Sequence, residues 1–269
     1  FISDVGMATV FAMTNLEDLT IECSKVTDAG LSGLSKLANL KSLMMWHKTD
    51  LITGTNINKS LSRLETLHLG PGTTNAGLQS ACEIETLTTL SFLGAHSFKS
   101  ITDEGLPHIG KLKNLRSLSM NNVEVITATA LGPVLSGLDH LEEIHLSNCR
   151  QLSEIAQYLA AVSNLKKLTL TCWFSTMMMD AFVSISKLQS VETLTLDGNR
   201  VLNDACLQDI ATMPSLHTLN IRGCYAVTTA GLEHLAASPT LRKLDVSHCY
   251  NLPSDCASLF PKSISVVKK

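Results

Sequence analysis

One short pattern recurs along almost the whole chain. It has the form L-x-x-L-x-L, and its first position occurs ten times at intervals of 23 to 28 residues. These first positions are Leu16, Leu40, Leu64, Leu87, Leu115, Leu141, Leu165, Val191, Leu216 and Leu241. Apolar residues that alternate with polar ones at a period of two predict a strand with one buried face. We therefore expect ten short strands at regular intervals.

The second half of each unit predicts a helix. The segments "VTDAGLSGLSKLAN" (26–39), "ITDEGLPHIGKLKN" (101–114) and "VTTAGLEHLAASPT" (227–240) align with one another. Each has a threonine followed by acidic or small residues, which is the chemistry of a helix N-cap. Apolar residues such as Leu232 and Leu235 then follow at helical spacing.

Units of this kind can bury their apolar faces only by stacking on one another. We therefore expect an α/β fold, a horseshoe-shaped solenoid of about ten repeats with a parallel sheet on its concave face and helices on its convex face. At roughly 4.8 Å between neighbouring strands, the inner arc would measure about 50 Å. The prediction is a single domain over residues 1–269, with the helical half of an incomplete first repeat at 1–15, ten repeats at 16–260 and a tail or edge strand at 261–269.

The units resemble leucine-rich repeats over essentially the whole chain. A cysteine shortly after L-x-x-L-x-L and a T-D-x-G-L helix start make them similar to the cysteine-containing repeats of F-box ubiquitin-ligase receptors. The matching cysteines are Cys23, Cys149, Cys172, Cys224 and Cys249. Pro71-Gly72 and Asn199 depart from this pattern, "GAHSFKS" lengthens the fourth unit, and no F-box precedes the first repeat in these residues. The resemblance implies a non-enzymatic scaffold that binds a protein partner, in one version as the substrate receptor of a ubiquitin ligase.

The chain contains eight cysteines but no C-x-x-C pair, which removes the commonest zinc-site spacing. Cys224 and Cys249 occupy the same place in adjacent units, so their Cα atoms should lie about 5 Å apart, within reach of a disulfide. Equivalent side chains in a stacked array point the same way, which disfavours the bond. We interpret the cysteines as reduced, buried thiols, and the protein as cytoplasmic.

The net charge of the chain does not indicate a class of partner. Its 21 basic and 24 acidic residues give a formal net charge of -3, which offers no support for nucleic-acid binding. No apolar run approaches the roughly 20 residues that cross a bilayer, so we expect no membrane partner. Because the chain begins with Phe1, a targeting segment or a further domain upstream remains open.

Catalytic motifs are missing from the sequence. There is no G-x-S-x-G, P-loop or G-x-G-x-x-G motif. The nine histidines lie in different registers, and His248 beside Cys249 is the nearest approach to a ligand cluster. We therefore expect no enzymatic activity, no metal and no cofactor.

The remaining hypothesis is that the concave face recognises a partner. Because side chains alternate between the two faces of a strand, the sequence predicts which residues point to that face. Most of them are serine and threonine. The candidates for partner binding on this face and its loops are Met44, Trp46, His68, His145, Arg222, Tyr225 and Tyr250. Large apolar side chains aimed at solvent suggest a covering partner, although Trp46 could instead pack on a neighbouring repeat. Two alternatives to a free adaptor are an architectural subunit held permanently in a large complex and an extracellular receptor, which the unpaired thiols disfavour.

Overall fold

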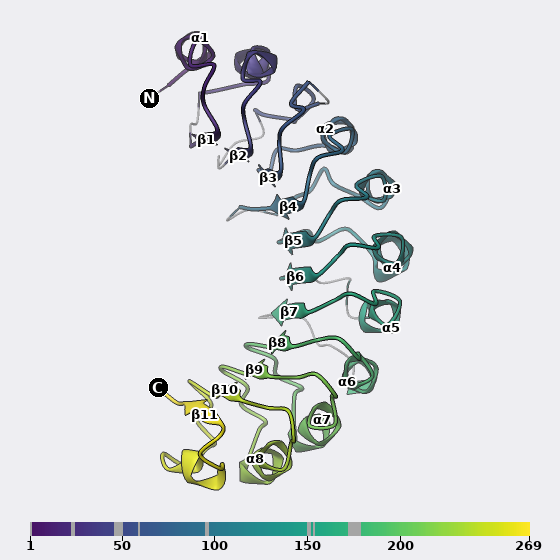
Figure 1. Cartoon of the computed structure of the whole chain (residues 1–269), viewed down its shortest axis with the longest axis vertical. Helices are drawn as coiled ribbons and strands as arrows, with labels where there is room; N and C mark the ends of the chain where they lie inside the picture. The colour runs from purple at the N-terminus through teal and green to yellow at the C-terminus, as the bar shows by residue number, and fades with distance from the viewer. Residues whose placement is uncertain are drawn as a thin grey trace. The chain divides into compact units, whose positions relative to one another are not determined.

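The chain forms two compact units in the computed structural model, Phe1–Leu141 and Glu142–Lys269. The structure describes residues 2–22, 25–45, 51–58, 60–94, 97–149, 152, 154–171 and 179–269. Each unit is a series of repeats, and in most of them a short strand is followed by a helix or helical turn (Figure 1). Among the described residues between 45 and 66 there is no helix.

The elements of both units follow the predicted order. In the first unit they are α1 (Asp4–Val10), β1 (Asp18–Ile21), η1 (Ala29–Leu31), η2 (Leu34–Lys36), β2 (Ser42–Met45), β3 (Thr66–Leu69), α2 (Asn75–Ala81), β4 (Thr89–Phe92), α3 (Leu106–Ile109), β5 (Ser117–Asn121) and α4 (Ala128–Ser136). In the second unit they are β6 (Glu143–Ser147), α5 (Ala156–Leu159), β7 (Lys167–Thr171), α6 (Met179–Ser186), β8 (Thr193–Thr195), α7 (Asp204–Ile210), β9 (Thr218–Asn220), α8 (Thr229–Ala236), β10 (Lys243–Asp245), η3 (Cys256–Leu259) and β11 (Ser265–Val267).

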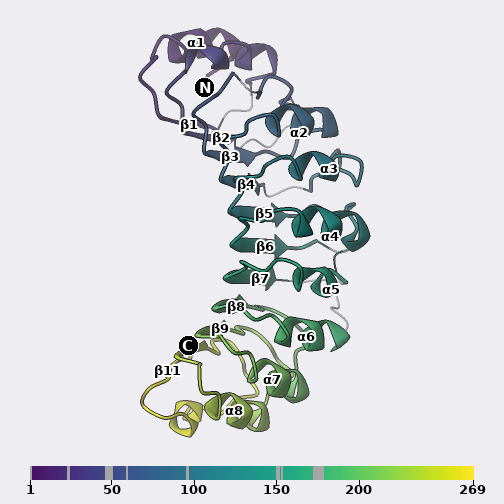
Figure 2. The same ribbon diagram turned by 45° about the vertical axis from the view of Figure 1, so that its right-hand side comes forward.

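Neighbouring strands within each unit are parallel and in the register of the sequence repeat. Leu43 pairs with Leu67 in the first unit, and Leu168 pairs with Leu194 in the second. In both units the helices lie on one side of the strands (Figures 1 and 2). The leucines of the pattern are buried between the two layers, except that Leu16 and Leu19 of the first repeat are half-buried. The other side of the sheet, which we call the open face, is the one the sequence predicts to be concave. The α/β repeat fold is therefore confirmed.

In four of the described repeats, an aspartate at the helix start binds the next repeat. Asp204 Oδ1 accepts a hydrogen bond from the Thr228 backbone N–H at 2.8 Å, and Asp204 Oδ2 accepts one from the Thr228 hydroxyl at 2.6 Å. Asp4 binds Thr27 in the same way. The T-D pair of the motif therefore serves two repeats, because the threonine is held by the repeat before it and the aspartate holds the repeat after it.

The glycine of the T-D-x-G-L motif leaves room for that carboxylate. A Cβ atom on Gly231 would lie 2.4 Å from Asp204 Oδ1, and one on Gly30 would lie 2.2 Å from Asp4 Oδ1. Real Cβ atoms do not approach oxygen so closely, so any side chain at these positions would push the two repeats apart.

The helical segments differ in length from the prediction. Segment 26–39 forms two 3₁₀ turns, η1 and η2, and segment 101–114 contains only the four-residue α3. Gly30 and Gly33 lower the helix propensity of the first segment. A Cβ on Gly33 would also lie 2.2 Å from the Phe11 ring, so the turn packs too closely for a regular helix face. Elsewhere the predicted caps are confirmed, since Thr127 accepts from the Ala130 N–H and Thr228 from the Ala230 N–H.

Candidate functional site

The open face of the first unit carries two of the predicted site residues side by side. Met44 in β2 and His68 in β3 are register partners, and both are half-buried while their strand neighbours are fully buried. The third candidate of this region, Trp46, lies outside the described residues. The alternating burial confirms which strand positions face away from the helices, but it leaves the partner-binding role of these residues a prediction.

The two histidines of the open face are kept neutral by their surroundings. Burial lowers the pKa of His68 and the pKa of His145, because a partly dehydrated imidazole resists taking up a proton. The buried Nδ1 atom of His68 has no hydrogen-bond partner among the described residues. Both imidazoles are therefore mainly neutral near pH 7.

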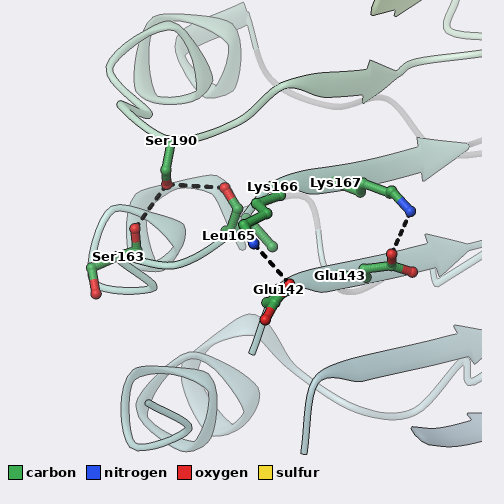
Figure 3. A network of polar contacts seen from close by, with 7 residues as sticks. All are labelled: Glu142, Glu143, Ser163, Leu165, Lys166, Lys167 and Ser190. Atoms are coloured by element: carbon green, nitrogen blue, oxygen red, sulfur yellow. Dashed lines mark hydrogen bonds and ion pairs between the residues drawn. The ribbon is translucent and has the colours of Figure 1, made fainter. Parts of the chain in front are cut away.

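His145 lies on β6 in the second unit. Two ion pairs lie near the start of the same strand (Figure 3). Lys166 binds Glu142 at 3.0 Å, and Lys167 binds Glu143 one position along the same two strands. The pairs lie at the beginning of the strands, and the Ser190 hydroxyl donates to the Ser163 and Leu165 carbonyls on the helix side (Figure 3). Each of these exposed charges is neutralised within its ion pair, so they contribute little to the binding of a charged partner.

The loops that follow β8, β9 and β10 share one backbone conformation. The residue before the inward side chain adopts a positive φ, which is 70° at Gly198, 66° at Gly223 and 60° at His248. Glycine takes this conformation freely and histidine takes it more often than most residues. Hydrogen bonds then stack the loops, since Gly198 N–H donates to the Arg222 carbonyl at 2.7 Å and Gly223 N–H donates to the Ser247 carbonyl at 2.9 Å.

The next residue of each loop anchors it in the core. The Cys224 thiol donates to the Leu196 carbonyl at 3.3 Å, and the Cys249 thiol donates to the Ile221 carbonyl at 3.1 Å, each one repeat earlier. Burial raises the pKa of Cys224 to about 12. A thiol with so high a pKa is a poor nucleophile and a poor metal ligand at neutral pH. The buried position predicted for Cys224 is therefore confirmed, and its role is to hold the loop.

The stacked loops enclose a hollow of about 340 Å³. It is lined by Asp197, Gly198, Arg200, Arg222, Gly223, Tyr225, His248 and Tyr250, which come from three successive repeats. Three of the predicted site residues, Arg222, Tyr225 and Tyr250, thus meet at one place. Met44, His68 and His145 do not line it.

Two exposed aromatic rings form one wall of the hollow. Tyr225 and Tyr250 are 48% and 74% exposed, and their rings are stacked with centroids 5.9 Å apart and planes 10° apart. Each tyrosine follows its buried cysteine directly, so one strand spacing separates their backbones. The His248 ring meets Tyr250 edge-on at 6.2 Å. Stacked rings with so much exposed surface form a ready platform for a ligand.

Two charged residues of the hollow were not among the predicted binding residues, although the strand period placed one of them, Asp197, on the concave face. Arg200 occupies the position of the two tyrosines one repeat earlier, and Asp197 occupies that of Arg222. Asp197 Oδ1 accepts a hydrogen bond from the Arg222 backbone N–H at 3.1 Å. Burial raises the pKa of Asp197, while the nearby Arg222 opposes the shift. The repeat register could have identified both residues, because equivalent positions of stacked repeats lie side by side.

The described part of the chain has no cluster of metal ligands and no helix suited to crossing a membrane. No group of three or more histidine, cysteine, aspartate or glutamate side chains there could hold a metal ion. None of the helices described is both long enough and apolar enough to cross a membrane.

Comparison with known proteins supports the fold. No family model matches the chain. Yeast Rad7, in its complex with Elc1, has a TM-score of 0.58 at 19% identity, and the match covers 100% of this chain and 84% of that one. An internalin C2 of Listeria monocytogenes has a TM-score of 0.50 at 19% identity over 78% of this chain and 83% of its own. At such identities the likeness shows a leucine-rich-repeat fold and nothing finer.

A sequence relative matches a smaller region. The Caenorhabditis elegans protein EEED8.10, whose name marks it as a candidate RNA-binding protein, is 33% identical over 90 residues. The match covers 33% of this chain but only 12% of the relative.

Proposed function

We propose that the protein is a non-enzymatic binding module that holds a protein partner on the open face of its sheet and on the adjoining loops. The observation that carries the proposal is the exposed stack of Tyr225 on Tyr250 beside the loop hollow. Tyrosine and arginine are common among the residues that dominate protein interfaces. Met44, Trp46, His68 and His145 belong to the same proposal as residues of the open face.

The likeness to Rad7, solved with Elc1, supports one specific version. In it the repeats select a substrate for an F-box type ubiquitin ligase, while another segment contacts the ligase. The six cysteines of the described region are buried thiols, which fits a reducing compartment such as the cytoplasm. The net charge of -3 favours a protein over a nucleic acid as the partner.

Quantitative affinity purification from the native source tests the proposal. The Y225A/Y250A variant should lose at least one protein that the parent enriches. The matched control is V183S, which changes an exposed apolar residue on α6. If the tyrosine variant and the control retain the same proteins as the parent, the loops are not the binding site.

A further inference from the structure

The loop hollow of the second unit has a surplus of hydrogen-bond donors. Arg200 and Arg222 are exposed, and neither guanidinium forms an ion pair or a hydrogen bond with any described residue. The hydroxyl of Tyr225 likewise has no hydrogen-bond partner among the described residues. Three donors from two adjacent repeats thus surround one hollow and have no acceptor in the described part of the chain.

Two carboxylates of these loops and strands accept hydrogen bonds from the backbone. Asp197 Oδ1 accepts from the Arg222 N–H at 3.1 Å, and Asp245 Oδ1 accepts from the Ser247 N–H at 2.9 Å. Both side chains are half-buried and hold the loops, whereas the guanidinium groups extend into solvent. The accessible part of the hollow is therefore cationic beside an aromatic wall.

We propose that this hollow binds an acidic segment of the protein partner, in which a carboxylate pairs with Arg200 and Arg222 while a neighbouring aromatic side chain packs against the Tyr225–Tyr250 stack. The inference rests on the proposed function and specifies the chemistry of its partner. Arginine presents a planar fork of donors that matches a carboxylate. The volume of about 340 Å³ admits one or two side chains, at the lower end of the roughly 300–1,000 Å³ of ligand pockets.

A peptide fits this hollow better than a single-stranded RNA. Proteins that bind RNA strands without sequence preference use a positively charged groove that follows the phosphate backbone. Here the cationic region is confined to two arginines, and Asp197 and Asp245 lie beside it. Two arginines can pair with one or two carboxylates of a peptide, but they do not form the continuous positive groove that a run of phosphates needs.

Fluorescence anisotropy with labelled peptides tests the inference. The probe is acetyl-Gly-Glu-Glu-Trp-Glu-Glu-Gly-amide, and its control replaces the four glutamates by glutamines. We expect the parent to bind the acidic peptide at least about fivefold more tightly. The R200Q/R222Q variant should lose this preference. The K187Q/K243Q variant, which removes two exposed charges of the same unit outside the hollow, should keep it.

Three results would overturn the inference: equal affinity for the two peptides, a preference that survives in R200Q/R222Q, or tighter binding of an oligouridylate RNA than of the acidic peptide. An unchanged melting temperature of R200Q/R222Q shows that its loss of preference is not unfolding. If the tyrosine variant loses a protein partner but the parent shows no preference for acid, the proposed function stands and this inference fails.

Discussion

The carboxylate of Asp103 accepts hydrogen bonds from both the backbone N–H and the hydroxyl of Thr127, each at 2.8 Å, although the two residues lie in successive repeats. Asp204 and Thr228 repeat this arrangement in the second unit. The relationship turns a helix-start motif into a link between repeats, so the stability of one repeat depends on the side chain of the previous one.

Replacing Asp103 by alanine should therefore lower the free energy of unfolding by about 1–3 kcal/mol, because two charge-assisted hydrogen bonds are lost at a half-buried site. Urea unfolding followed by circular dichroism measures the change. The matched control is E104A at the exposed neighbouring position, which should stay within about 0.5 kcal/mol of the parent. Equal effects of the two substitutions would show that the hydrogen bonds between Asp103 and Thr127 contribute nothing to the free energy of unfolding.

Replacing Gly231 by alanine should lower the free energy of unfolding by about 1–3 kcal/mol, because the new Cβ would lie 2.4 Å from Asp204 Oδ1. In G137A the nearest atom to the new Cβ is 3.6 Å away, so this control should unfold nearly like the parent. Thermal unfolding of the two variants compares them. A G231A protein as stable as G137A would contradict the close approach.

The stability of the protein should fall as the pH decreases below 7. The folded-state pKa of His68 and that of His145 lie below the unfolded value of about 6.5, so the unfolded chain binds more protons in this range. Their contribution is complete above the unfolded pKa and is lost on the acid side. Urea midpoints at about pH 7.5 and about pH 5.5 measure the loss. The H68Q/H145Q variant should lose less than the parent, and an equal loss would assign the dependence to other groups.

Cys224 should resist iodoacetamide at about pH 8 in the folded protein, because its buried thiol has a pKa of about 12. Peptide mass spectrometry locates the modified cysteines, and the urea-unfolded chain is the control in which Cys224 should react readily. Rapid labelling of Cys224 in the folded state would mean that its loop opens and that the thiol is not the anchor described above.

The strands and their register could be predicted from the sequence. A shift of one residue would turn the leucines of every repeat from the core to the solvent. The helices were less predictable, since Gly30 and Gly33 shorten a segment whose apolar spacing is helical. The hydrogen bonds of Asp103 could not be predicted from the sequence. An acidic residue is expected at a helix start for local reasons alone, and its partner Thr127 is 24 positions away.

Part of the candidate site could be predicted from residue type and from the position in the repeat. Arg222, Tyr225 and Tyr250 stood out as types common in interfaces, and the structure brings them to one hollow. Asp197 was assigned to the concave face but, like Arg200, was not predicted as a member of the site. The repeat register places both beside the tyrosines, because equivalent positions of stacked repeats are neighbours. Met44, His68 and His145 remain predictions for the open face.

Site-specific photo-crosslinking tests the central claim most directly. p-Benzoylphenylalanine at position 225 replaces one aromatic ring by another, and the same group at position 183 on α6 is the control. Irradiation in the native source should give a discrete protein adduct from position 225 and none of that adduct from position 183. Adducts from position 183 alone, or crosslinks from position 225 to nucleic acid alone, would contradict a protein-binding site at the tyrosine stack.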